Sequence, residues 1–174
     1  DAAQPISNAL YARYGIVPRL PVLELVGRPE RAGPAALPDG VRAVPFELLA
    51  AGPTDGPGPR RLAAALAALD REVLGYAHPQ DHAYLRETGR LGNLYEAGDG
   101  RIVGYGYVSP VGRVGPLAVE DAALLSGVLG HLLHAVEPAG AFSAWVPGAA
   151  GAAITALLDA GLRIEDFPAL LCWD

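Results

Sequence analysis

Four histidines are the side chains of this sequence that most directly suggest metal or acid–base chemistry. His78 and His82 are four residues apart, which on a continuous helix would place both rings on one face, as in a metal-binding pair. Pro79 lies between them and argues against such a helix, and no third ligand follows at a suitable spacing. We therefore favour a turn with capping side chains and predict no metal site. His131 and His134 lie beside an apolar helical stripe, where we expect them at the surface or core boundary.

Two tyrosines form a second group of candidate residues. Tyr105 and Tyr107 alternate with Gly104 and Gly106 in a strand-like run, so both tyrosines point to one face and the glycines to the other. Two interpretations stay open. The tyrosines either pack a core against a helix, or they form the aromatic wall of a substrate cleft for which the glycines leave room.

A single cysteine, Cys172, excludes an internal disulfide and a cysteine-based metal site. Because it lies in an apolar run near the end of the sequence, we expect a buried structural thiol.

Hydrophobic periodicity predicts the elements that must position these side chains. One amphipathic helix carries its apolar stripe at Leu62, Leu66, Leu69 and Val73. The polar segment 75–89 contains a proline, so we expect a helix broken by a turn there. The other helices are expected over 5–14, 122–136 and 149–160, and the strands over 21–26, 41–46, 91–97, 101–109, 113–119, 141–146 and 169–173. Segments 28–40 and 52–59 are rich in proline and glycine, and we interpret the first as a linker.

Composition limits the classes of partner and the location. The 174 residues carry a net charge of −6, and all 13 basic residues are arginines, without a clustered basic surface. Nucleic-acid binding is therefore not expected. No apolar run approaches the roughly 20 residues that a membrane span needs, and no signal peptide is visible, so a cytoplasmic location without membrane association is the expectation. The absence of methionine suggests a fragment of a longer protein.

The two ends of the sequence resemble each other at an offset of 146 residues. Residues 4–16 and 150–162 are both helix-like, both end in glycine plus an aliphatic residue, and a strand-like run follows each. Such a repeat at domain spacing suggests a tandem protein. Among their differences is the position that could do chemistry, where Tyr11 in the first copy corresponds to Leu157 in the second.

Three motifs carry a resemblance to a known family. The opening Q-P-I-S-N-A-L-Y-A-R-Y-G-I-V-P-R is similar to the closing block of GNAT-superfamily N-acetyltransferases, with Gln4 in place of the usual Asn. The strands G-R-I-V-G-Y-G-Y and R-V-G-P-L-A-V follow in the order of that family. The resemblance implies an α/β (α+β) fold with a mixed, mostly antiparallel central sheet flanked by helices. Residues 1–27 would then be the last helix and strand of a preceding GNAT-like domain, 28–40 a linker, and 41–174 a GNAT-like domain.

The resemblance also implies acetyl-CoA as co-substrate, bound where two parallel strands splay apart. Its pyrophosphate would rest on the free N–H groups that begin the long helix. The positions implied for cofactor binding are Leu117, Val119, Gly127, Leu129 and Gly130.

This pattern is incomplete at the phosphate end. Gly127 matches the family's loop glycine, but Leu124 and Leu129 stand where Arg or Gln and Gly or Ala are usual. The carboxylates of Glu120 and Asp121 would repel a phosphate. Two alternatives remain, a modified CoA site or an ordinary helix start with Asp121 as its cap, and we favour the second.

Catalysis in this family needs an acid for the departing thiolate and a base for the amine. Tyr11 occupies the position of the family's acid in the first copy, and packing alone is its other interpretation. In the second copy Leu157 cannot transfer a proton. Glu96 lies on a strand that carries the base in relatives, although a carboxylate beside a Gly-Asp-Gly turn is ordinarily solvated. The other candidate bases are His78, Asp81 and His82.

Two functions follow from these expectations. The full protein would be a GNAT-family enzyme that transfers an acetyl group from acetyl-CoA to an amine of an unknown small acceptor. Alternatively, residues 41–174 form a degenerate lobe with a structural, substrate-cleft or dimerisation role. The expected partners are the N-terminal GNAT domain of the same protein, a small amine, and a second copy through a sheet edge. We expect strand 21–26 to pack on the 41–174 sheet or on another copy.

Overall fold

The computed structural model describes residues 4–29, 36–51, 53 and 56–173. Its strands are β1 Val17–Gly27, β2 Val41–Pro45, β3 Leu91–Ala97, β4 Ile102–Val108, β5 Arg113–Val119, β6 Phe142–Pro147 and β7 Arg163–Trp173. Its helices are α1 Pro5–Arg13, α2 Phe46–Ala50, α3 Pro57–Leu74, α4 Pro79–Glu87, the short 3-10 helix Ala122–Leu124, α5 Leu125–Ala135 and α6 Gly151–Asp159.

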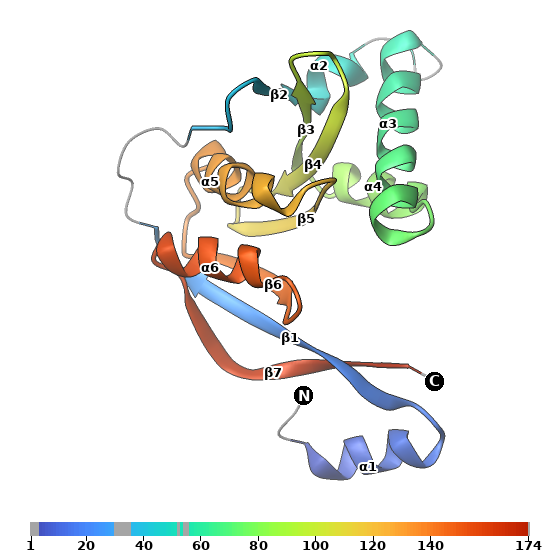
Figure 1. Ribbon diagram of the computed structural model, residues 1–174, viewed down its shortest axis with the longest axis vertical. Helices are drawn as coiled ribbons and strands as arrows, with labels where there is room; N and C mark the ends of the chain where they lie inside the picture. The colour runs from blue at the N-terminus through green and yellow to red at the C-terminus, as the bar shows by residue number, and fades with distance from the viewer. Residues whose placement is uncertain (1–3, 30–35, 52, 54–55, 174) are drawn as a thin grey trace.

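The described strands form a seven-stranded sheet in the order β2-β3-β4-β5-β6-β1-β7. Neighbouring strands are antiparallel except β5 and β6, which are parallel (Figure 1). The predicted fold class, an α/β fold with a mostly antiparallel mixed sheet flanked by helices, is therefore confirmed.

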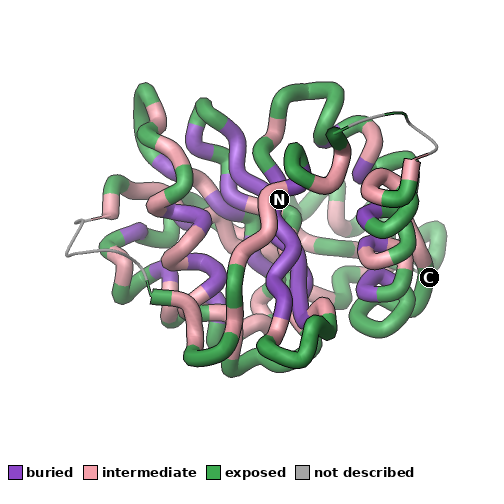
Figure 2. The backbone as a smooth tube through the Cα atoms, turned by 90° about the horizontal axis from the view of Figure 1, so that it is seen from above, coloured by how far each residue is buried: buried purple, intermediate pink, exposed green. Residues whose placement is uncertain are grey.

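Helices cover the sheet from both faces. On one face α5 and α6 pack on a core that includes Leu25, Val128 and Leu157. On the other face α2, α3 and α4 enclose a second core around Phe46, Leu66 and the tyrosines of β4. Figure 2 shows the buried backbone gathered in the middle of the molecule and the exposed residues around it.

Most elements lie close to their predicted bounds, whereas β1 begins at Val17 and β7 at Arg163, before the predicted starts at 21 and 169. Leu62, Leu66 and Leu69 are buried in α3, whereas Val73 in its last turn is 40% exposed. The five-residue helix α2 is too short to show a helical period. Pro79 begins α4 instead of breaking a helix, because proline fits the first helical turn. Within the two predicted loops, residues 30–35, 52 and 54–55 lie outside the described part.

Strand β1 lies inside the sheet, between β6 and β7. Its residues Val22–Gly27 pair with β6, and its other edge pairs with β7 along most of its length. Leu25, near the end of this strand, is fully buried. The predicted strand 21–26 thus packs on the sheet of residues 41–174, which was one of the two expected arrangements.

The repeated helix–strand units meet as neighbours in this sheet. Units α1–β1 and α6–β7 have the same order of elements, and their strands pair antiparallel. Their helices differ in environment. Leu157 is fully buried on α6, whereas its counterpart Tyr11 on α1 is 51% exposed. Ile6, Leu10 and Tyr14, expected on one face of α1, are also exposed, and no residue of α1 is buried. Figure 1 shows α1 projecting from the end of the molecule away from α3 and α4.

Candidate functional site

The parallel strands β5 and β6 separate soon after they meet. They pair at Arg113 with Ser143 and at Val114 with Ala144, and the pairing ends there. Beyond this point a cavity of about 200 Å³ lies between the two strands and the helices α5 and α6. We call it the strand-separation cavity. Its lining includes Leu117 of β5, Leu125 and Leu129 of α5, Val146 of β6, and Ala153 and Leu157 of α6.

The structure divides the residues implied for cofactor binding into two groups. Leu117 and Leu129 line the strand-separation cavity. Val119, Gly127 and Gly130 do not, and Val119 packs at the edge of the core under α5. Two of the implied residues thus line a cavity and three do not, and their role in cofactor binding stays a prediction.

Gly127, the residue that matched the family's loop glycine, faces the linker. A Cβ atom built on it would lie only 2.6 Å from Cδ of Pro38 and 3.4 Å from the carbonyl oxygen of Ala36. The absence of a side chain at this position therefore accommodates the linker. It does not leave an open face for a phosphate.

The two carboxylates before α5 already have partners. The Asp121 side chain accepts a hydrogen bond from the N–H of Ala123 at 2.9 Å and so caps the 3-10 helix, as expected for an ordinary helix start. Glu120 forms an ion pair with Arg101. The negative charges of Glu120 and Asp121, and the N–H group that Asp121 already binds, together make this helix start unfavourable for binding a pyrophosphate.

Neither predicted catalytic residue lines the strand-separation cavity. Tyr11 lies on α1, and Leu157 occupies its position in the cavity wall. Glu96 is nearly buried, at 6% exposure, and accepts hydrogen bonds from Arg42 at 2.7 Å and Arg61 at 2.9 Å. The hydrogen bond from Arg42 is the main cause that lowers the pKa of Glu96, although its burial opposes this shift. Glu96 is therefore a structural ion-pair partner in this chain, and its proposed role as a base has no support from its surroundings.

The candidate bases His78, Asp81 and His82 do not converge on one point. His78 precedes α4 and lies 3.4 Å from the Asp81 carboxylate, while His82 is buried and turns toward α3. In the described part of the chain we find no group of three or more possible metal ligands. His131 and His134 are half-buried at the core boundary, and His131 lies 3.1 Å from the hydroxyl of Tyr95.

A buried polar cluster between α3, α4 and β4 was missed from the sequence. Asp70 of α3 is fully buried and accepts hydrogen bonds from the Tyr105 hydroxyl at 2.9 Å and from Nε2 of His82 at 3.0 Å. Nδ1 of His82 lies 2.8 Å from the Tyr107 hydroxyl. Because a carboxylate only accepts, Nε2 of His82 carries the proton of that bond. The available sequence signal was an aspartate four residues after Leu66 on the apolar stripe of α3.

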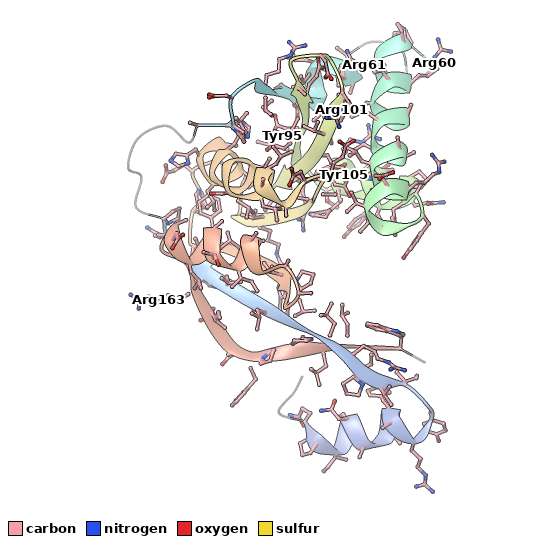
Figure 3. The ribbon with its side chains drawn as sticks, in the orientation of Figure 1. Arg60, Arg61, Tyr95, Arg101, Tyr105 and Arg163 are labelled. Atoms are coloured by element: carbon pink, nitrogen blue, oxygen red, sulfur yellow. The ribbon has the colours of Figure 1, made fainter. Side chains whose placement is uncertain are left out.

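This cluster settles the alternatives for the two tyrosines. Tyr105 and Tyr107 are buried against α3 and α4, and burial raises the pKa of both phenols. On the opposite face, a Cβ built on Gly106 would lie 2.7 Å from Cδ1 of Leu132, so the glycine makes room for α5 and not for a substrate. Figure 3 shows Tyr95 on the side of α5 and Tyr105 on the side of α3 and α4.

Burial acts to raise the pKa of Asp70, but the hydrogen bonds to its carboxylate lower this pKa by more. The N–H of His78, the Tyr105 hydroxyl and His82 together hold the pKa of this carboxyl below its usual value. The cluster is enclosed and internally satisfied, which is the pattern of a structural network.

Cys172 is half-buried, and its thiol lies 3.6 Å from the carbonyl oxygen of Leu170. Among the described helices we find none with the length and apolar character that a membrane crossing requires.

Neither a protein-family model nor a curated protein sequence matches the chain. Solved structures do. The chain is similar to a candidate acetyltransferase from Pyrococcus horikoshii, with a TM-score of 0.62 and 17% identity over 99% of this chain and 51% of that one. It is also similar to a GCN5-related N-acetyltransferase from Sphaerobacter thermophilus, with a TM-score of 0.59 and 19% identity over 98% of this chain and 56% of that one.

A third similar structure is a conserved protein of unknown function from Enterococcus faecalis V583, described as a probable N-acyltransferase. Its TM-score is 0.55, with 14% identity over 97% of this chain and 43% of that one. The chain therefore has the fold of GNAT-type N-acetyltransferases, and it spans about half the length of these structures.

Proposed function

We propose that this chain is part of a GNAT-type enzyme that transfers an acetyl group from acetyl-CoA to the amine of a small acceptor. The observation that carries the proposal is the strand-separation cavity between β5 and β6, within a fold shared with acetyltransferase structures. Its apolar walls suit an acyl group and would keep water away from a thioester.

The residues of this chain fit only part of acetyl-CoA. Leu117 and Leu129 suit its apolar arm, whereas Pro38 covers Gly127 and Asp121 caps the helix start where a pyrophosphate would bind. Leu157 in the cavity wall offers no proton to a departing thiolate. We therefore do not expect this lobe to transfer an acetyl group by itself.

A second candidate role follows from this partial fit. Residues 41–174 would be a degenerate lobe that shapes a substrate cleft or stabilises a catalytic lobe. In that arrangement α1 and β1 are the last helix and strand of the preceding catalytic lobe, and Tyr11 is its proton donor. The exposed side of α1 supports this role, because the equivalent side of α6 is buried on its own lobe.

Calorimetric titration with acetyl-CoA tests the proposal. We expect no saturable binding to residues 1–174 at millimolar cofactor, and micromolar binding to the longer protein that contains a preceding lobe. Coenzyme A without the acetyl group serves as the matched ligand control.

Two results would contradict these expectations. Absence of binding to both proteins would remove the acetyltransferase proposal. Micromolar binding to the 174-residue chain, lost in Gly127→Val, would show that this lobe holds the cofactor and is not degenerate.

A further inference from the structure

A second cavity opens at the same strand separation. It has a volume of about 280 Å³ and is lined by Arg90, Arg113, Val114, Gly115, Pro116, Ser143 and Trp145. We call it the arginine cavity. Ser143 and Trp145 alternate along β6 with residues that pack under α5 and α6, so this cavity faces away from those helices. Val114, Gly115, Pro116 and Trp145 line both cavities.

The two guanidinium groups of this cavity have no carboxylate partner among the described residues. Arg90 is half-buried and donates to the carbonyl oxygen of Gly115, whereas Arg113 is exposed and its guanidinium has no side-chain partner in the described part of the chain. Burial, followed by the positive charge of Arg113, lowers the pKa of Arg90. The remaining positive charge of the cavity is therefore uncompensated.

Other arginines of the chain show the contrasting arrangement. Arg42 and Arg61 pair with Glu96, and Arg101 pairs with Glu120. Arg90 and Arg113 differ from these three arginines in lining one cavity without a carboxylate partner among the described residues. Two such forks next to each other match the oxygens of a carboxylate or phosphate group, which each fork can bind through parallel hydrogen bonds.

Negative side chains lie nearby but in a separate cavity. Glu24, Glu165 and Asp166 line a cavity of about 390 Å³ that shares Trp145 with the arginine cavity. Glu24 is the register partner of both Trp145 and Glu165 on the neighbouring strands. The indole of Trp145 thus stands between a positive and a negative region of the same open sheet face.

We propose that Arg90 and Arg113 bind the carboxylate or phosphate group of a small ligand, with Trp145 as the apolar wall beside it. Because the arginine cavity adjoins the point where β5 and β6 separate, this ligand would lie beside the strand-separation cavity. Binding of the anion does not depend on the proposed acetyl transfer.

The sequence offers a direct spectroscopic test. Of its two tryptophans, Trp145 lines the arginine cavity and Trp173 does not. In a Trp173→Phe background, Trp145 fluorescence is followed during titration with propionate, inorganic phosphate or propionamide at constant ionic strength. We expect a saturable change with at least one anion and none with the neutral amide. The better of the two anions identifies the acidic group.

Variants of the arginines sharpen the test. Arg113→Gln should weaken anion binding about ten-fold, because a charge-assisted hydrogen bond is lost. Arg113→Lys, which keeps the charge but not the fork, should retain an intermediate affinity. Arg163→Gln is the matched control, because Arg163 points away from the molecule at the start of β7 (Figure 3) and should leave binding unchanged. Thermal unfolding of each variant verifies that it is folded.

The inference is overturned if neither anion gives a saturable change, if propionamide acts as strongly, or if Arg113→Gln binds as well as the parent. If the longer protein nevertheless binds acetyl-CoA, such a result would not contradict the acetyltransferase proposal. Anion binding without any acetyl-CoA binding would overturn only the proposed function.

Discussion

The sequence alone does not predict the role of Asp70 in the buried polar cluster, although its position on a helix is noticeable. An aspartate on the apolar stripe of a helix is noticeable, because an unpaired buried carboxylate is costly. Its partners lie on α4 and β4, and their approach depends on tertiary packing that periodicity does not encode. The contact between Gly127 and Pro38 could not be predicted for the same reason, because the two residues come from distant segments of the chain. Leu117 and Leu129 line the strand-separation cavity, and their role in cofactor binding stays a prediction.

At this scale we predict that Asp70→Asn destabilises the protein by about 3 kcal/mol at pH 7, since it removes the charged partner of a buried network. The folded-state pKa of Asp70 is lowered, so its stabilisation is present above the unfolded pKa of about 3.9 and is lost as pH falls through the folded value. The difference between wild type and variant should therefore shrink in acid. Urea unfolding between pH 3 and 8 measures it.

Asp159→Asn is the control for this experiment, because Asp159 is exposed at the end of α6. It should change the free energy of unfolding by less than about 0.5 kcal/mol. A constant difference between wild type and Asp70→Asn across the pH range would show that the carboxylate charge is not what stabilises the cluster.

The elements divide into those that a local pattern predicts and those that tertiary pairing determines. Helix α3 and the hairpin β3–β4 follow from apolar period and turn residues. Strand β7 begins at Arg163, well before its apolar end, because the polar stretch after Gly161 pairs with β1. Packing of β1 on the sheet of residues 41–174 was one of two expected arrangements, but its position between β6 and β7 was not predicted. An apolar strand indicates that it needs neighbouring strands without indicating which ones.

This division predicts unequal effects of the same substitution in β1 and α1. Leu25→Ala should cost about 2–5 kcal/mol, because it leaves a cavity at a fully buried position. Leu10→Ala on α1 should change stability by less than about 0.5 kcal/mol, because Leu10 is 54% exposed. Chemical denaturation of both variants compares them directly. Equal losses would mean that α1 packs on the rest of the chain more closely than its exposure indicates.

At the scale of the whole molecule, the described strands form one sheet, and helix α1 has no buried residue. The helix–strand units at the two ends share sequence pattern and element order, yet only α6 is packed on a core. The similar solved structures are about twice as long as this chain. We propose on the basis of the unburied α1 that this helix belongs to a lobe that precedes this one.

We predict that in the longer protein the amides of α1 exchange hydrogen at least about ten-fold more slowly than in the 174-residue chain. The physical reason is that docking on a preceding lobe would bury the side that carries Tyr11. Mass spectrometry of peptides covering 5–13 measures the change, and the amides of α6 are the internal control.

The same longer protein tests the chemistry of this helix. Tyr11→Phe should lower acetyl transfer by about a hundred-fold if its phenol donates the proton, whereas Tyr14→Phe should not. Unchanged exchange in α1 together with full activity of Tyr11→Phe would contradict the two-lobe arrangement.

The position of β1 also sets the order in which this chain can fold. β1 is synthesised well before its partner strands, Phe142–Pro147 and Arg163–Trp173. Closing such long loops is slow, and an apolar strand without its partners is prone to pair elsewhere. β1 therefore cannot take its place in the sheet until both β6 and β7 have been synthesised.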